Sequence, residues 1–358
     1  MEQRWDEFER RIEMSNGTDQ LCQLRSEFHG SFGASFMTED IENSMERLNA
    51  IHDAFIRKAV YLAEQSVGWK EGDRDKAVSY VLLLFGSGGR QEQTFSSDQD
   101  NGIVYEAAPG VAHEVAEQYV AELGDAIQRQ LEAIGYPPCD GNVLGSNVFW
   151  RRTTSGWGAT LREWAELRSF ETVRNLLIAA DARPASGNSE LANRFISEYS
   201  AMVQEYHRVL LPRMLESTLR HKVLIGVLGN LLTERYGADS GGIDIKYGIY
   251  IPMVNGIRLL ALQEGIEATS TLKRIRELKR RGAIRSVTAD DWESAFLSVL
   301  SFRTMVPTQS EHGFYTNRGK MPAKLLTKQV KKELKRTLRI GAQLQKQVKR
   351  AFGSEGRL

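Results

Sequence analysis

Residues 81–105, VLLLFGSGGRQEQTFSSDQDNGIVY, predict a strand, a glycine turn, a short helix and a second strand. Residues 81–85 are an uninterrupted apolar run, typical of a strand that is buried on both faces. The turn at 86–89 interrupts this run, since glycine adopts the backbone angles of tight turns and lets a ligand approach closely. A short helix over 90–95 would point its first amides outward, where they could bind phosphate. Apolar residues at 103–105 then predict the second strand.

The sequence Asp98-Gln99-Asp100 opens this second strand. On a strand, residues i and i+2 point to the same face, so the two carboxylates would converge. Convergent carboxylates repel each other unless a cation lies between them or one of them is protonated. Hard oxygen ligands of this kind suit magnesium, which also recruits substrate phosphates. The pattern therefore predicts a site for nucleoside triphosphate chemistry, and the alternative is a polar turn in which both aspartates are turn formers.

The turn and the acidic pair together resemble a known signature. The matching residues are Gly86-Ser87-Gly88-Gly89-Arg90-Gln91-Glu92 and Ser97-Asp98-Gln99-Asp100-Asn101. They are similar to the signature of the DNA polymerase β-like nucleotidyltransferases. Within this superfamily the sequence resembles the branch that contains PII-protein uridylyltransferase and glutamine-synthetase adenylyltransferase, and most of all a bacterial family of nucleotidyltransferases. It is not a Walker P-loop, because no Gly-Lys-Ser/Thr follows the glycines.

This resemblance implies a fold and a set of ligands. The fold would be α+β, with a small mixed, palm-like sheet flanked by N-terminal helices and a C-terminal helical bundle. Asp98 and Asp100 would hold one or two Mg²⁺ ions, which Mn²⁺ could replace. Ser87 and the amides of residues 86–89 would bind the β- and γ-phosphates of a nucleoside triphosphate, ATP or UTP. Arg90 would assist there, or would pair with Glu92 and brace the loop.

A third aspartate follows an apolar run over residues 176–180. We expect this run to be a strand that carries Asp181. In the two named relatives, a third carboxylate near the metal pair lies in an Asp-x-Arg context that is followed by a glycine, and Asp181-Ala182-Arg183 with Gly187 is similar to it. By this resemblance Asp181 completes the catalytic and metal-binding triad and activates the acceptor hydroxyl. The alternative is a structural pair of Asp181 with Arg183 at a strand end.

The rest of the chain is predicted to be mostly helical. Near the N-terminus, apolar residues recur at helical spacing and predict one buried helix face, formed by Ile41, Met45, Leu48, His52 and Phe55. Trp150, Trp157 and Trp164, at seven-residue intervals, favour one helix face in a core over the wall of a pocket. We expect three domains: N-terminal helices at 1–72, a catalytic domain at 73–188, and a helical substrate- or nucleotide-binding domain at 189–358.

Two features of the last of these domains bear on ligands. Asp244-Ile245-Lys246 resembles part of the family's C-terminal domain, and Lys246 could contact the triphosphate as a point charge. Equally, Asp244 and Lys246 could form an ion pair that orders the loop. The helix predicted over 325–352 is amphipathic with a basic face, which favours a solvated face on a packed helix over a surface that binds nucleic acid, an acidic protein or anionic lipid.

The composition excludes several classes of protein. Of 358 residues, 41% are hydrophobic and 26% charged, and the formal net charge of +1 does not mark a general nucleic-acid binder. The two cysteines, Cys22 and Cys139, argue against a disulfide framework or a cysteine zinc site. No apolar run is long enough to span a membrane, and the N-terminus lacks an apolar signal core. We therefore expect a cytoplasmic protein without a membrane partner.

The leading hypothesis is a magnesium-dependent nucleotidyltransferase that transfers a nucleoside monophosphate to a hydroxyl group and releases pyrophosphate. The resemblance to the regulatory branch favours a protein acceptor, although the same site could serve a small molecule or an RNA end. The alternative is a regulatory protein that keeps the fold and binds nucleotide without turnover. The presence of all three candidate carboxylates favours the enzyme.

Overall fold

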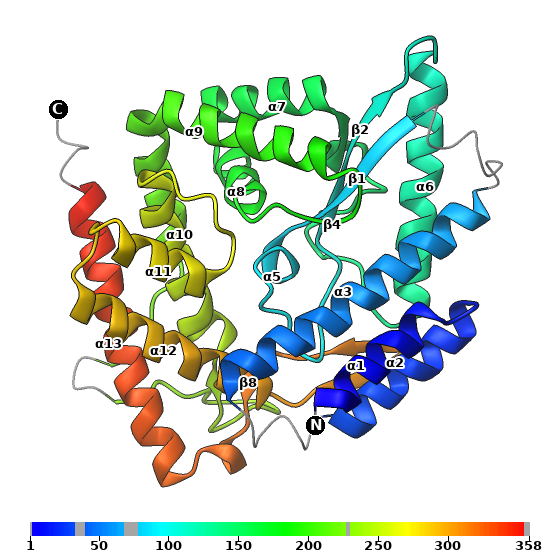
Figure 1. Cartoon of the computed structure of the whole chain (residues 1–358). Coiled ribbons are helices and arrows are strands. Elements are labelled where there is room, and N and C mark those ends of the chain that lie inside the picture. The colour runs from blue at the N-terminus through cyan, green and yellow to red at the C-terminus, as the bar shows by residue number, and fades with distance from the viewer. Residues whose placement is uncertain (1, 33–39, 68–77, 227–229, 354–358) are drawn as a thin grey trace. The chain divides into compact units, whose positions relative to one another are not determined.

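The computed structural model describes residues 2–32, 40–67, 78–226 and 230–353 (Figure 1). The chain divides into two compact units. The first contains Met1–Leu161, Asp181–Tyr199 and Thr308–Thr316, and the second contains Arg162–Ala180, Ser200–Pro307 and Asn317–Leu358. The expected boundary between residues 72 and 73 lies outside the described residues. The division into three domains stays a prediction.

A four-stranded mixed sheet forms the centre of the first unit. The strands are β1 (Val78–Leu84), β2 (Asn101–Ala107), β3 (Arg151–Thr153) and β4 (Arg183–Gly187). Their order is β3-β2-β1-β4; β1 is antiparallel to β2 and β4, and β2 is parallel to β3. Almost every residue of β1 is buried, as its continuous apolar run predicts. The α+β class with a small mixed sheet is confirmed.

Helices flank this sheet. Those of the first unit, or beginning in it, are α1 (Glu2–Glu13), α2 (Thr18–Phe32), α3 (Ile41–Ser66), α5 (Gly86–Gly89), α6 (His113–Ala133), the 3-10 turn η2 (Val148–Trp150), α7 (Thr154–Leu167) and α9 (Ser189–Thr218). The carboxylate of Asp40 caps α3 by accepting a hydrogen bond of 3.2 Å from the amide of Asn43. Met45, Leu48, His52 and Phe55 are buried along α3 and Ile41, at its start, is half-buried, so the predicted apolar stripe is confirmed from Met45 onward.

The three tryptophans are buried, but they do not share one helix. Trp150 lies in η2, whereas Trp157 and Trp164 lie in α7, so the expectation of a single helix face is wrong. The interruption is β3, which pairs with β2 between the first two tryptophans. The indole of Trp157 donates a hydrogen bond of 3.0 Å to the carbonyl of Ile103 in β2, which ties α7 to the sheet.

A hairpin from late in the chain packs into the first unit. Its strands are β6 (Gln309–Glu311) and β7 (Phe314–Thr316). The ring of Tyr315 stacks on His29 with centroids 3.6 Å apart and planes at 11°, and its amide donates to the carbonyl of Gly135 at 3.0 Å. Beside them the buried guanidinium of Arg25 lies 4.3 Å from the ring centroid of Tyr136.

Two histidines of this region, His29 and His52, should make the first unit sensitive to acid. Burial, and then the charge of Arg25, lower the pKa of His29 from 6.5 to about 3 and the pKa of His52 well below 6.5. As the pH falls through about 6.5, the ordinary pKa of histidine, these histidines take up protons in the unfolded chain but not in the folded chain. The free energy of unfolding therefore falls as the pH falls. We expect Tm to decrease between about pH 7.5 and about pH 5.5, where most carboxylates stay charged.

Thermal melts followed by circular dichroism across this range test the prediction. The variant His29→Phe keeps an aromatic ring against Tyr315 but has no titrating group, so its Tm should depend less on pH. A wild-type Tm that stays constant over this range would contradict the argument.

The second unit is mainly helical. Besides the C-terminal parts of α7 and α9 it contains α8 (Phe170–Ala179), the π-helical turn η3 (Lys246–Tyr250), α10 (Ile251–Gln263), α11 (Thr271–Arg280), α12 (Ser286–Thr304), the 3-10 turn η4 (Ala323–Leu325) and α13 (Lys328–Gly353). A short antiparallel pair joins β5 (Ile243–Asp244) to β8 (Lys320–Met321). None of the helices in the described ranges is long and apolar enough to cross a membrane.

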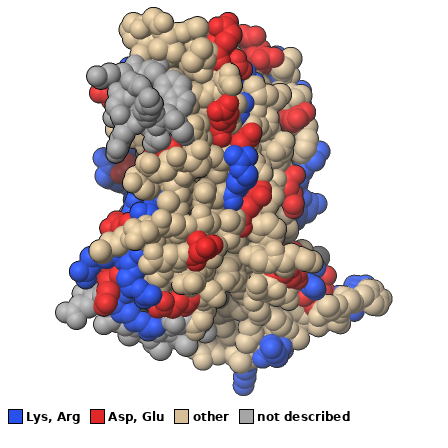
Figure 2. All heavy atoms as spheres, turned by 90° about the vertical axis from the view of Figure 1, so that its right-hand side faces the viewer, with Lys and Arg blue, Asp and Glu red and all other residues tan. Residues whose placement is uncertain are grey.

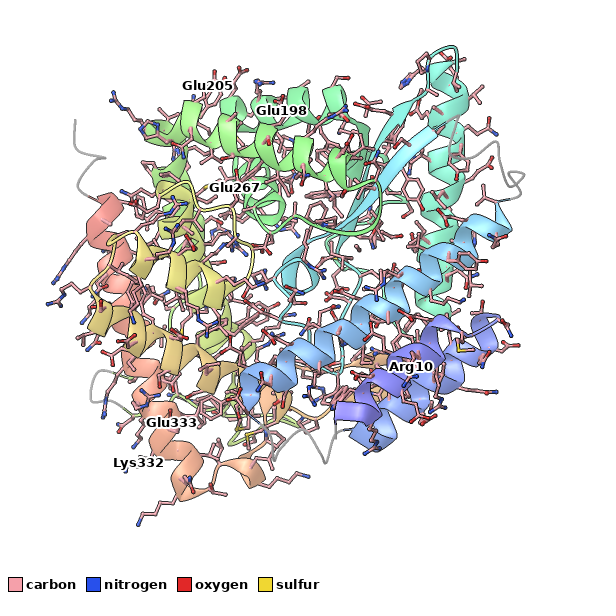
Figure 3. All side chains as sticks on the ribbon, in the orientation of Figure 1. Arg10, Glu198, Glu205, Glu267, Lys332 and Glu333 are labelled. Atoms are coloured by element: carbon pink, nitrogen blue, oxygen red, sulfur yellow. The ribbon has the colours of Figure 1, made fainter. Side chains whose placement is uncertain are left out.

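The basic amphipathic helix predicted near the C-terminus is α13. Its buried apolar residues include Leu334, Leu338, Leu344 and Val348. Lys332 is exposed, whereas Glu333 beside it accepts hydrogen bonds from Ser298 and Arg336, both at 2.8 Å (Figure 3). The solvated basic face of α13 stays a prediction. Figure 2 shows a different face of the molecule, on which acidic and basic side chains are interspersed among neutral ones.

Candidate active site

The glycine turn is itself the short helix. Residues Gly86–Gly89 form the helical turn α5, and residues 92–95 have no regular structure, so the expected helix over 90–95 is wrong. Gly89 donates the first hydrogen bond of this turn, to the carbonyl of Phe85 at 2.8 Å. The amides of residues 86–88 therefore precede the helical hydrogen bonds, as at any helix start. Gly86 has φ of +52°, a conformation that favours glycine.

The acidic pair lies directly beside this turn. Asp98 and Asp100 flank Gln99, which forms a β-bridge with Pro138 and is therefore extended. A Cβ at Gly86 would overlap the carboxylate of Asp100, and the amide of Phe85 donates to the carbonyl of Asp100 at 2.9 Å. The structure thus brings the glycine turn and the acidic pair together.

Asp98, Asp100 and Cys139 form an acidic group that could hold a metal ion. One ligand atom from each of these residues lies within 4.8 Å of the others. Burial, and then the charges of Asp100 and Asp98, raise the pKa of the Cys139 thiol to about 12. Thiol sulfur is a soft ligand, so the two carboxylates are the donors that fit a hard divalent cation. Nothing in the local sequence around Cys139 indicated that it lies beside the aspartates.

Asp181 lies in a turn and not on a strand. The apolar run before it is the last part of helix α8, so the expected strand over residues 176–180 is wrong. The Asp181 carboxylate is fully buried and pairs with the guanidinium of Arg90, whose Nε donates to Glu92 at 2.9 Å. Asp181 is not part of the acidic group around Asp98 in the described structure. Its role as a third metal-binding carboxylate stays a prediction.

Arg90 and Arg183 make ion pairs beside the glycine turn. Two roles were expected for Arg90, binding of phosphate or a pair with Glu92 that braces the loop. The structure contains the pair with Glu92. Arg183 makes a bidentate pair with Asp53 of α3, at 2.7 and 3.0 Å, and also donates to the carbonyl of Gly88 at 2.9 Å. Asp181 thus pairs with Arg90, and Arg183 pairs with Asp53. The alternative prediction, in which Asp181 and Arg183 pair with each other, does not describe these contacts.

Lys246 belongs to the second unit. Its amide donates to the carbonyl of Gly319 at 3.1 Å, and its ammonium lies 5.6 Å from the ring centroid of Tyr247. The carboxylate of Asp244 accepts a hydrogen bond of 2.7 Å from the amide of Tyr247, so Asp244 orders the start of η3 through the backbone. Contact between Lys246 and a triphosphate stays a prediction.

The close packing of α5 leads to a first prediction about the site. A Cβ at Gly89 would overlap the carbonyl of Asp181 and lie 2.8 Å from the carbonyl oxygen of Leu84. Backbone atoms cannot rotate away, so we expect Gly89→Ala to lower the free energy of unfolding by about 2 kcal/mol and to weaken nucleotide binding. Urea denaturation and equilibrium titration with a nucleoside triphosphate measure the two effects.

Gly88→Ala is the matched control. A Cβ there would meet its nearest atoms, in Leu84, at 3.5 Å, which is ordinary van der Waals contact. Its effects should therefore be smaller than those of Gly89→Ala. Equal effects of the two substitutions would show that the packing at Gly89 does not determine the turn.

Two family models match the chain. The model described as "Putative nucleotidyltransferase DUF294" matches residues 34–171, which include the glycine turn, the acidic pair and Cys139. The model described as "Putative nucleotidyltransferase substrate binding domain" matches residues 208–352, which include Lys246. Asp181 and Arg183 lie between the two matched segments. A search of curated proteins found no match.

Proposed function

Because the chain belongs to the DUF294 family of putative nucleotidyltransferases, we propose that it transfers a nucleoside monophosphate from a nucleoside triphosphate to a hydroxyl group and releases pyrophosphate. The observation that carries this proposal is the convergence of Asp98 and Asp100 beside the glycine turn. Two hard carboxylates next to a turn of glycines suit a triphosphate and its counter-cation.

The two carboxylates would hold Mg²⁺, or Mn²⁺ in its place. When bound, such a cation would offset the negative charge of the triphosphate and of the departing pyrophosphate. Ser87 and the backbone of residues 86–89 would bind the phosphates, because the amides of residues 86–88 precede the helical hydrogen bonds of α5. These residues would act mainly by positioning, which is where most of the rate enhancement of phosphoryl transfer originates.

Asp181 would orient the acceptor hydroxyl for in-line attack on the α-phosphate, which requires that its carboxylate, buried in this structure, become accessible to the acceptor. Its carboxylate is held by Arg90, so its position depends on that ion pair. The α-phosphorus–oxygen bond to the attacking hydroxyl forms as the bond to pyrophosphate breaks, and the hydroxyl proton passes to a carboxylate or to water. Lys246, in the segment that matches a substrate-binding domain, would contact the triphosphate.

Nucleotide incorporation tests the proposal. Labelled ATP, UTP, GTP and CTP are supplied separately with Mg²⁺ or Mn²⁺, with a cell lysate as the source of acceptors. We expect one triphosphate to label a discrete acceptor, which we propose to be a protein, and pyrophosphate to be released in equal amount. Binding of a triphosphate without pyrophosphate release would support a regulatory protein without turnover. Failure to bind any triphosphate would contradict the proposal.

A further inference from the structure

The segment between the glycine turn and the acidic pair is buried although it has no regular structure. Gln93, Thr94 and Phe95 have 3%, 3% and 8% of their surface exposed. Buried backbone groups need hydrogen-bond partners, and a segment outside helices and strands cannot find all of them in its own backbone. Three side chains from helices α2 and α3 supply such partners.

Each of these side chains binds a different residue of the segment. Asn49 accepts a hydrogen bond of 2.9 Å from the amide of Gln93, and its own amide group lies 3.5 Å from the Gln93 carbonyl. His52 and Arg25 bind the next two carbonyls, of Thr94 at 2.8 Å and of Phe95 at 3.2 Å. All three side chains are buried, with at most 1% of their surface exposed.

The environment of His52 fixes its chemical form. A carbonyl only accepts, so Nε2 of His52 carries the proton that it donates to Thr94. Burial, first, and then the charge of Arg25 lower its pKa well below 6.5, so the ring is neutral. Nδ1 therefore accepts from the hydroxyl of Tyr136 at 2.7 Å. Both ring nitrogens are used, as in a positioning histidine whose orientation is set by two partners.

The same face of α3 also reaches the glycine turn. Asn49, His52 and Asp53 occupy positions i, i+3 and i+4, which lie on one side of a helix. Asp53 binds Arg183, and the Arg183 guanidinium donates to the carbonyl of Gly88. In Figure 1, α3 passes alongside α5 and the loop that follows it. One helix face therefore reaches the glycine turn indirectly, through Asp53 and its partner Arg183, and the loop to the acidic pair directly, through Asn49 and His52.

We propose that α2 and α3 are positioning elements of the active site, with Asn49 and His52 as positioning residues that set the distance between the glycine turn and the Asp98–Asp100 pair. This inference rests on the proposed function, in which the glycine turn before residues 93–95 binds phosphate and the acidic pair after them binds a metal ion. Loss of these contacts would let residues 93–95 shift without unfolding the sheet. Small displacements of metal-binding groups lower both affinity and rate.

Asn49→Ala is the test variant, and the full chain is used throughout. We expect faster hydrogen exchange at the Gln93 amide, because the acceptor of that amide is removed. We also expect Mn²⁺, titrated alone and followed by its electron paramagnetic resonance signal, to bind about 10-fold more weakly, and kcat to fall about 10- to 100-fold. Ile56→Ala is the control, since Ile56 is buried on the same helix but makes no hydrogen bond through its side chain.

A second pair of variants covers the case in which Asn49→Ala does not fold. His52→Gln keeps an N–H that can donate to Thr94, whereas His52→Leu has no donor. We expect His52→Leu to weaken Mn²⁺ binding like Asn49→Ala, and the glutamine to restore most of the affinity. A purely structural role would change Tm in both variants without this difference in metal affinity.

The outcomes separate this inference from the function on which it rests. If the wild type binds Mn²⁺ and the Asn49→Ala and His52→Leu variants bind it equally well, the positioning role is overturned while the metal site stands. If Ile56→Ala weakens binding as much as Asn49→Ala, the effect is general destabilisation and the inference is wrong. If the wild type itself binds no Mn²⁺, the proposed function fails, and that failure is seen without any variant.

Discussion

Replacement of Asp98 and Asp100 by asparagine should lower nucleotide transfer by about 10³-fold or more, with the fold retained. Asparagine has nearly the size of aspartate but no charge, so the double variant can neither hold a divalent cation nor offset the charge of a triphosphate. Because the two carboxylates lie within 4.8 Å of each other, removal of their mutual repulsion should leave the Tm equal to the wild-type value or higher. Transfer assays and thermal melts measure the two effects.

Cys139→Ser is the control for this experiment. The thiol lies within the same acidic group, but sulfur is a soft donor that suits a hard cation such as Mg²⁺ poorly, so it should contribute little to metal binding. We expect this variant to transfer nucleotide at nearly the wild-type rate. A double aspartate variant with wild-type transfer would show that the acidic pair is not the metal site, and a large loss in Cys139→Ser would show that the thiolate is a ligand.

The acidic pair was predictable because its geometry is local. Asp98 and Asp100 are two residues apart, and an extended backbone is enough to bring their carboxylates to one side. The glycine turn was predictable for a similar reason, since Gly86 to Gly89 interrupt an apolar run. The short helix was predicted over residues 90–95, too late in the chain, because the glycine turn is itself the helix α5. At Gly86 and Gly89 a side chain would overlap Asp100 or the backbone of Asp181 and Leu84, which local propensity does not reveal.

The environment of Asp181 was not predictable from the apolar run alone. A run such as residues 176–180 suits a buried strand or the end of a buried helix, and periodicity does not separate the two. A signal for the helix was present, since the Ser169 hydroxyl accepts a hydrogen bond of 3.1 Å from the Thr172 amide and caps α8. The partner of Asp181 could not be predicted, because Arg90 is 91 residues away along the chain.

The positioning residues on α3 were also missed. His52 was predicted only as part of an apolar stripe, and no role was predicted for Asn49. Three polar residues at i, i+3 and i+4, on the face of a helix that is otherwise apolar, are a usable signal, because a buried polar group must have a partner. The identity of that partner requires the fold, since residues 93–95 reach α3 only through the packing of the first unit.

Arg90→Met should destabilise the first unit by about 3–5 kcal/mol, because it leaves two buried carboxylates without their cation. Arg90, Glu92 and Asp181 have 4%, 3% and 0% of their surface exposed, so water cannot replace the lost contacts. The free energy of unfolding is measured by urea denaturation. Arg194→Met is the matched control, since the Arg194 pair with Glu106 is exposed and should contribute less than about 1 kcal/mol.

The same experiment decides between the two roles expected for Arg90. If Arg90 bound phosphate in place of bracing the loop, Arg90→Met would lower nucleotide affinity and leave the free energy of unfolding unchanged. If Arg90 braces the loop, Glu92→Gln and Asp181→Asn added to Arg90→Met should restore part of the lost stability, because neutral side chains are less costly to bury than unpaired charges. Such a restored protein would still lack transfer activity if Asp181 orients the acceptor, so stability and activity would separate in one variant.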